Sequence, residues 1–351
     1  MFRITPPESQ SDKNLTTSRP RIAWLDSLKG FAIICVVVGH VVGGGPKANF
    51  TEDIFIARFI YNAIYAFHMP LFFVVSGFMY SMAYFDSEGR PKWAKLKWQL
   101  PNIVVLYFLF TTLLVAFRIL FGQHSESGTR WSDLLGILAH PYPIYWYLYD
   151  LAVFYILFIP LLRFAKSYLL LPLFFALRVF AADIPQIEGY DAQFMLFLNV
   201  PFFFLGIIFQ RTKVSISWWV ALAGLGTYVC LSMVGDGVLN YAKAFGALGL
   251  CLFFWKLFSS VKWLNAPFLN LCGRYSLEIY VLHFFPVCAF RSFFLPALGI
   301  TSFWSVFILN SALSTAIPIL IAVALQRVGI HDAVFRPAYF VKSRIEARAK
   351  P

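Results

Sequence analysis

Charged residues and cysteines are both scarce in this sequence. Asp, Glu, Lys and Arg make up 13% of the 351 residues, whereas apolar residues make up 60%. In soluble domains roughly a quarter of the residues are charged, so a water-soluble fold is excluded. The five cysteines form no close CxxC pair. Neither a zinc site nor a disulfide framework is therefore expected, and no metal cofactor is predicted.

Apolar residues gather in about ten runs, each close to the roughly 20 residues that a helix needs to cross a bilayer. The runs cover residues 24–42, 60–84, 100–121, 145–162, 167–181, 193–210, 217–234, 239–258, 275–291 and 302–326. We predict an all-α integral membrane protein, a bundle of about ten transmembrane helices. Residues 1–22 are expected to form a flexible N-terminal tail, 23–327 the transmembrane domain, and 328–351 a basic C-terminal tail.

Positive charge dominates, with 29 Lys and Arg against 17 Asp and Glu. When ten spans alternate in direction, most of the basic residues fall on one side of the membrane. This asymmetry is the one that marks the cytoplasmic side, so both termini are predicted to be cytoplasmic. The basicity is then explained by topology and by contact with membrane lipids, and no nucleic-acid partner is expected.

Two ionisable residues of the first run, Lys29 and His40, lie eleven positions apart. On a continuous helix this spacing puts both on one face, about 16 Å apart along the axis. Asp26 precedes Lys29 by three residues and can pair with it. Lys29 fits either a snorkelling role or a binding role. His40 fits either a general base or a structural hydrogen bond to a neighbouring helix.

Other polar residues lie in or beside the apolar runs. His68 lies two residues before Pro70, where it can bond a freed backbone carbonyl or contact a substrate. Asp150 and His283 are further ionisable candidates for supporting roles. Lys95 and Lys97 lie just before the third run, where they can anchor anionic lipid or bind the phosphates of a cytosolic cofactor.

Three groups of residues stand out together. They are Trp24-Leu25-Asp26 with Lys29 and His40; Phe67-His68-Met69-Pro70-Leu71-Phe72-Phe73 with Ser76-Gly77; and Tyr275-Ser276-Leu277 with Tyr280 and His283. Together they resemble the membrane-bound acyltransferase 3 family, especially fucose 4-O-acetylases and exopolysaccharide O-acetyltransferases. The first group matches the basic-x10-His pattern of that family. The resemblance extends over nearly the whole chain.

The resemblance implies transfer of an acyl group, usually acetyl, from cytosolic acetyl-CoA to a sugar hydroxyl of a lipid-linked or exported polysaccharide. It also implies a multi-pass protein of the bacterial cytoplasmic (inner) membrane. His40 would act as the general base or acyl carrier, and His68 would orient the acceptor or His40. Lys95 and Lys97 occupy the position of an Arg-x-Arg motif and, with Lys29, would hold the donor phosphates. The pantetheine arm of the donor would then extend along the first helix.

A transporter or flippase for a glycan or small solute is the main alternative, because carriers also place histidine and aspartate within membrane helices. Carriers often contain inverted repeats with paired Gly- or Pro-broken spans. No corresponding halves are visible in this sequence, so the acyltransferase interpretation is favoured.

Overall fold

The computed structural model describes residues 22–43, 54–121, 129–162, 167–180, 191–233, 239–300 and 302–348. Within these ranges the fold is all-helical, as predicted, and contains no β-strand. One isolated bridge joins Phe85 to Pro91 in the turn between two helices. All but the last residue of the predicted N-terminal tail lies outside the described residues.

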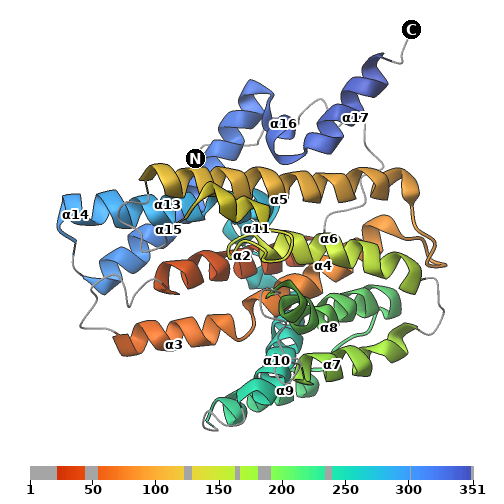
Figure 1. Cartoon of the computed structure of the whole chain (residues 1–351). Coiled ribbons are helices and arrows are strands. Elements are labelled where there is room, and N and C mark those ends of the chain that lie inside the picture. The colour runs from red at the N-terminus through yellow and green to blue at the C-terminus, as the bar shows by residue number, and fades with distance from the viewer. Residues whose placement is uncertain are drawn as a thin grey trace.

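The helices follow one another along the chain and differ widely in length (Figure 1). They are α2 Ala23–Gly43, α3 Ile54–Tyr65, α4 His68–Tyr84, α5 Trp93–Phe121, α6 Trp146–Leu161, α7 Leu171–Phe180, α8 Asp191–Thr212, α9 Trp218–Ser232, α10 Leu239–Ser260, α11 Pro267–Arg274, α12 Ser276–Leu282, α13 Phe284–Ala289, α14 Leu295–Leu298, α15 Phe303–Val328, α16 His331–Phe335 and α17 Pro337–Arg348. A π-helical turn, η7, covers Phe290–Phe294 between α13 and α14.

Five helical stretches among the described residues are long and apolar enough to cross a membrane. They are Ala23–Gly43, Phe55–Tyr84, Trp93–Phe121, Ser276–Phe294 and Phe303–Val328. Five shorter apolar helices accompany them: Trp146–Leu161, Leu171–Phe180, Leu196–Thr212, Trp218–Ser232 and Ala244–Ser260. The chain is therefore a multi-helix membrane protein. The count of ten spans and the cytoplasmic termini remain predictions.

The second apolar run is not one continuous helix. It divides into α3, which ends at Tyr65, and α4, which begins at His68, with Phe67 between them in a non-helical conformation. Pro70 lies in the first turn of α4, where the missing backbone N–H has no helical partner to lose. The break therefore precedes the proline, and it places His68 at a helix start.

Glycines permit the closest helix crossings of the bundle. A methyl group at Gly273 of α11 would collide with the carbonyl oxygen of Asp26 in α2, and one at Gly30 would collide with that of Leu269. Small residues of this kind let membrane helices approach backbone to backbone. The crossing holds the N-terminal half of α2 against α11.

The predicted C-terminal tail contains two helices that pack onto the bundle. The Tyr339 hydroxyl of α17 donates to Gln99 of α5 at 3.0 Å, and the Ala338 backbone N–H donates to Asn102 at 3.3 Å. The Nε2 atom of His331 in α16 lies 2.9 Å from a carboxylate oxygen of Glu278 in α12. These contacts tie α16 and α17 to α5 and α12, and Figure 1 shows both helices at one edge of the molecule.

Candidate functional site

Helix α2 carries the two residues that the sequence places on one face. It is continuous from Ala23 to Gly43, so the spacing argument for Lys29 and His40 holds. The Lys29 ammonium lies 2.8 Å from the Asp26 carboxylate, and both side chains keep about a fifth of their surface exposed. His40 is half-buried near the other end of the helix. One helix thus presents an ion pair at one end and an imidazole at the other.

His283, at the end of α12, lies beside His40. The two ring centroids are 5.2 Å apart and the planes are tilted by 38°. Phe284 lies edge-on to His40 at 5.7 Å. The sequence assigned His283 only a supporting role, and the structure places it against the main candidate. Two imidazoles from opposite halves of the chain therefore form the centre of the site.

Hydrogen bonds fix which nitrogen of His283 holds the proton in its neutral form. Nδ1 lies 3.0 Å from the carbonyl oxygen of Ile279 and 2.8 Å from that of Tyr280. Carbonyl oxygens only accept, so Nδ1 is the donor and the lone pair is on Nε2. Nε2 is buried and has no hydrogen-bond partner within the described ranges. His283 therefore directs a proton-accepting atom into the interior.

His68 is held in the same way by the helix break that precedes it. Its Nδ1 lies 2.7 Å from the carbonyl oxygen of Ile64 in the last turn of α3. His68 thus bonds a backbone carbonyl, but that of Ile64 at the helix break and not one freed by Pro70; its contact with a substrate stays a prediction. Its ring lies 4.8 Å from that of Tyr65. A Cβ atom on Gly39 would be only 3.0 Å from the same tyrosine ring. His68 thus reaches the His40 end of α2 through Tyr65.

His40 differs from the other two histidines in the hydrogen bonding of its ring. It lies within electrostatic range of His283, His68 and Arg291. In the described part of the chain, no hydrogen bond to another group holds either of its ring nitrogens. Each neighbouring histidine has one ring nitrogen tied to a backbone carbonyl, whereas both nitrogens of His40 can exchange a proton or bond with an incoming group.

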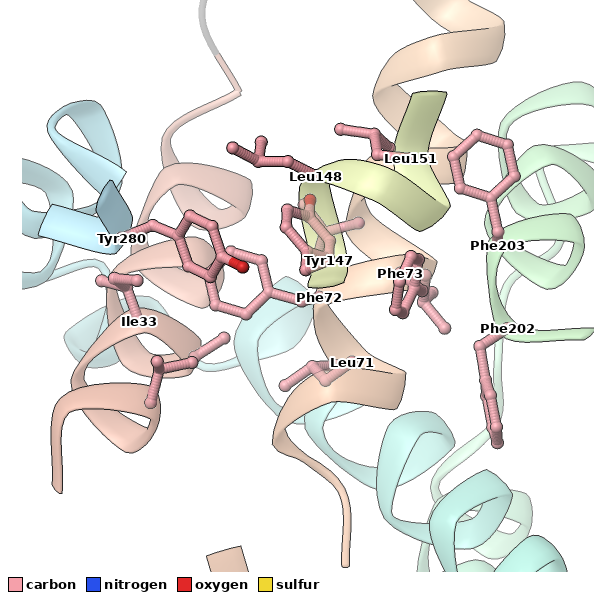
Figure 2. Close-up of a cluster of buried hydrophobic side chains, with 14 of the residues drawn as sticks. Ile33, Leu71, Phe72, Phe73, Tyr147, Leu148, Leu151, Phe202, Phe203 and Tyr280 are labelled. Carbon is pink, nitrogen blue, oxygen red and sulfur yellow. The ribbon is translucent and has the colours of Figure 1, made fainter. Parts of the chain in front are cut away.

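The face of α2 between Lys29 and His40 is filled by packed side chains. Ile33 is 0% exposed and Val36 is 2% exposed. Figure 2 shows Ile33 on the same side of the cluster as the rings of Phe72 and Tyr280, and Tyr147 lies 5.2 Å from Tyr280. An extended donor arm that follows this face must therefore displace these side chains.

Lys95 and Lys97 flank a buried leucine in the first turns of α5. Both lysines are exposed, whereas Leu96 is 2% exposed. The Lys97 ammonium lies 5.9 Å from the ring of Trp98. Helix α5 packs against α6 and α17, whereas Lys29 lies where α2 crosses α11. A shared basic mouth of the three lysines remains a prediction.

Asp150 lies in the core between α6 and α8, and no hydrogen bond or ion pair joins it to a histidine among the described residues. It is fully buried, and one carboxylate oxygen accepts a hydrogen bond from Asn199 at 3.4 Å. The other oxygen has no hydrogen-bond partner in the ranges that the structure describes. Asp150 is therefore a core residue, and no contact with His40 among the described residues supports the role predicted for it.

Two arginines near His40 escaped the sequence analysis. Arg291 donates from Nη2 to the carbonyl oxygens of His40, at 2.8 Å, and of Val41. Arg118 lies over the ring of Phe284 at 5.2 Å. Arg291 closes the apolar run 275–291, so it resembled a residue at the end of a span. An arginine at the predicted outer end of a helix, where the positive-inside rule disfavours it, is the signal in the sequence that could have revealed it.

A sequence model for an acyltransferase domain, that of the acyltransferase 3 family, matches residues 22–323. This match covers nearly all of the chain from the start of α2 into α15. The chain belongs to the acyltransferase 3 family. No curated protein and no solved structure matches it significantly.

Membership of the acyltransferase 3 family gives the histidine cluster a chemical context. An acyltransferase joins an acyl carbon to a nucleophile, and a neutral hydroxyl is a poor nucleophile until a base takes its proton. Within the acyltransferase domain, the cluster around His40 offers two lone-pair nitrogens with fixed tautomers and one imidazole without such a tether. This arrangement suits proton removal or formation of a covalent acyl intermediate.

Proposed function

We propose that this acyltransferase is an O-acetyltransferase that moves an acetyl group from cytosolic acetyl-CoA to a sugar hydroxyl of a lipid-linked or exported polysaccharide. The protein acts in the bacterial cytoplasmic membrane with both termini in the cytoplasm. The observation that carries the proposal is the imidazole pair of a half-buried His40 and a buried His283 within a helical acyltransferase domain. It lies at the end of α2 opposite Lys29.

His40 acts as the general base in this mechanism. It takes the proton of the sugar hydroxyl while the hydroxyl oxygen attacks the thioester carbonyl, so that a C–O bond forms and the C–S bond breaks. CoA leaves as the thiolate and takes up a proton from the imidazolium. In the covalent variant, His40 first forms a C–N bond to the acetyl carbon while the C–S bond breaks and CoA leaves as the thiolate. The hydroxyl oxygen then forms the C–O bond as the C–N bond breaks, His40 is released as a neutral imidazole, and the hydroxyl proton is taken up by the CoA thiolate.

Lys29, Lys95 and Lys97 hold the phosphates of the donor on the cytoplasmic side. Lysine offers a compact charge that suits phosphate but lacks the bidentate fork of arginine. The exposure of Lys95 and Lys97 supports this role, because the charges are accessible without rearrangement. The packed side chains of Ile33 and Val36 move apart when the donor arm enters. His68 orients the acceptor near the His40 end of α2.

The experiment supplies purified protein with acetyl-labelled CoA and a panel of lipid-linked oligosaccharides. Label in the glycan and free CoA are both measured, with His40→Gln protein as the matched control. We expect label to appear in a glycan in step with CoA release, and neither to occur with His40→Gln. If a glycan crosses a liposome membrane without acquiring label, the protein is a flippase and the proposal is wrong.

A further inference from the structure

The end of α2 is held by an arginine from a distant segment. One nitrogen of the Arg291 guanidinium, Nη2, donates to the backbone carbonyls of both His40 and Val41. The last carbonyls of a helix have no partner within the helix, and a cation is favourable there. Arg291 therefore takes the place of a C-terminal cap at the turn that bears the candidate base.

Arg291 and His283 belong to the same chain segment, so this segment contacts the end of α2 at two points. Its imidazole meets the His40 ring at 5.2 Å, and its guanidinium meets the His40 backbone at 2.8 Å. Arg291 lies in the π-helical turn Phe290–Phe294. Single π-turns within helices occur frequently at functional sites. One segment thus contacts the ring of His40 and hydrogen-bonds its backbone.

Burying Arg291 at this position costs free energy of folding. Its Nε atom is buried and lacks a hydrogen-bond partner in the part of the chain that the structure describes. An unpaired buried donor destabilises a fold, and a charged one does so more strongly. A smaller polar residue would cap the helix at less cost. The arginine at this site is therefore better explained by what it does to His40 than by stability.

We propose that Arg291 is a positioning residue for His40. By bonding the carbonyls of His40 and Val41, it sets the depth and rotation of the last turn of α2, so that the imidazole faces His283 and the acceptor hydroxyl. The inference rests on the proposed function of His40 and deepens it. A displacement of about 1 Å in a reacting group can cost about 10²-fold in rate.

The test compares Arg291→Gln and Arg291→Lys with a matched control, Arg178→Gln. Arg178 also donates to a backbone carbonyl, that of Leu198, and lies over an aromatic ring, that of Phe202 at 5.0 Å. It sits on α7, away from the histidines. Both glutamine variants thus lose a similar arginine contact. We expect Arg291→Gln to lose about 10²-fold in kcat with little change in the KM for acetyl-CoA, whereas Arg178→Gln keeps its turnover.

Two further measurements separate positioning from stability. Guanidinium ion should restore part of the activity of Arg291→Ala, and Arg291→Lys should fall between wild type and Arg291→Gln, because lysine keeps the charge but not the geometry. If the activities of Arg291→Gln and Arg178→Gln fall in proportion to their thermal stability, or if guanidinium restores nothing to folded Arg291→Ala, the proposal is wrong.

A readout independent of the donor distinguishes this proposal from the proposed function. Diethyl pyrocarbonate modifies accessible imidazoles, and mass spectrometry identifies each modified histidine. We expect Arg291→Gln to change the modification rate of His40 relative to wild type, and Arg178→Gln to leave it unchanged. This result holds even if acetyl-CoA is not the donor. An unchanged His40 rate in Arg291→Gln would overturn the positioning role whatever the assay of transfer shows.

Discussion

The rings of His40 and His283 lie 5.2 Å apart, centroid to centroid, although one belongs to α2 and the other to the end of α12. The tether of His283 to two backbone carbonyls leaves its Nε2 lone pair available. His40 has no such tether among the described residues. The pair thus joins a fixed proton acceptor to an unrestrained imidazole.

Replacement of His40 should abolish transfer without unfolding the bundle. We expect His40→Ala and His40→Gln to reduce turnover by about 10²- to 10⁴-fold or more, because the proton of the hydroxyl loses its acceptor. Binding of acetyl-CoA, measured with labelled donor, should persist. His68→Gln serves as the control, since the glutamine amide can still donate to the Ile64 carbonyl and the loss should be smaller. Near-normal turnover in folded His40→Gln would show that His40 is not the base and would make His283 the candidate.

Removal of the exposed lysine pair on α5 should affect the donor more than the acceptor. The double variant Lys95→Ala with Lys97→Ala should raise the KM for acetyl-CoA, because two accessible positive charges near the phosphates are lost. Initial rates at varied donor and acceptor concentrations check this. Lys262→Ala, at another exposed lysine, is the matched control. An unchanged donor KM in correctly inserted double variant would favour lipid anchoring.

The glycine crossing of α2 and α11 should not accept a side chain. Gly273→Ala places a methyl group against the carbonyl oxygen of Asp26, and we expect a loss of about 1–3 kcal/mol or more. Thermal unfolding in detergent measures the effect. Gly226→Ala is the control, because a Cβ at Gly226 meets nothing within 4 Å. There, helix propensity predicts a gain of up to about 1 kcal/mol. Equal effects at the two positions would contradict the close crossing.

The contact of His331 with Glu278 should make stability depend on pH. Burial disfavours the charged imidazole, but hydrogen bonds and the charges of Asp332 and Glu278 outweigh it and raise the pKa of His331 from 6.5 to about 9. The stabilisation is therefore complete below the unfolded pKa of 6.5 and is lost as the pH rises through about 9. His331→Gln should lower the melting temperature most below the unfolded pKa and little above the folded one.

A second substitution in the same region controls for the pH effect of His331. Tyr339→Phe removes the hydrogen bond from α17 to Gln99, and no group that titrates near neutral pH takes part in that bond. We expect Tyr339→Phe to lower the melting temperature by a similar amount at every pH. A flat pH profile for the loss in His331→Gln would show that the ion pair does not contribute to stability.

The membrane orientation can be tested with reporter fusions. Because most of the 29 basic residues fall on one side of ten alternating spans, fusions at both ends of the chain should report the cytoplasm. Fusions after Leu135 and Phe294 should report the opposite side. A terminus found outside would reverse the side from which acetyl-CoA is proposed to enter.

The sequence determined the class of fold and most of the candidate residues by itself. In a bilayer each helix must satisfy its own backbone hydrogen bonds, so composition and run length alone reveal helices such as α2 and α5. The cost of burying polar groups in lipid likewise marks His40, His68 and His283 as exceptions. The spacing of Asp26 and Lys29 was enough to predict their ion pair, because one helix contains both residues.

Only the tertiary structure decided which of these residues meet. Whether His283 or Asp150 approaches His40 depends on how α12 and α6 pack around α2, and packing depends on side-chain shape across segments far apart in sequence. The same holds for Arg291: its place at the predicted outer end of a span signals a role, but only the structure shows that it bonds the His40 carbonyl. The break before His68 could not be predicted from the sequence either, because the apolar pattern continues through Phe67 whereas the helical backbone conformation does not. Local chemistry fixed the helices, and long-range packing fixed the site.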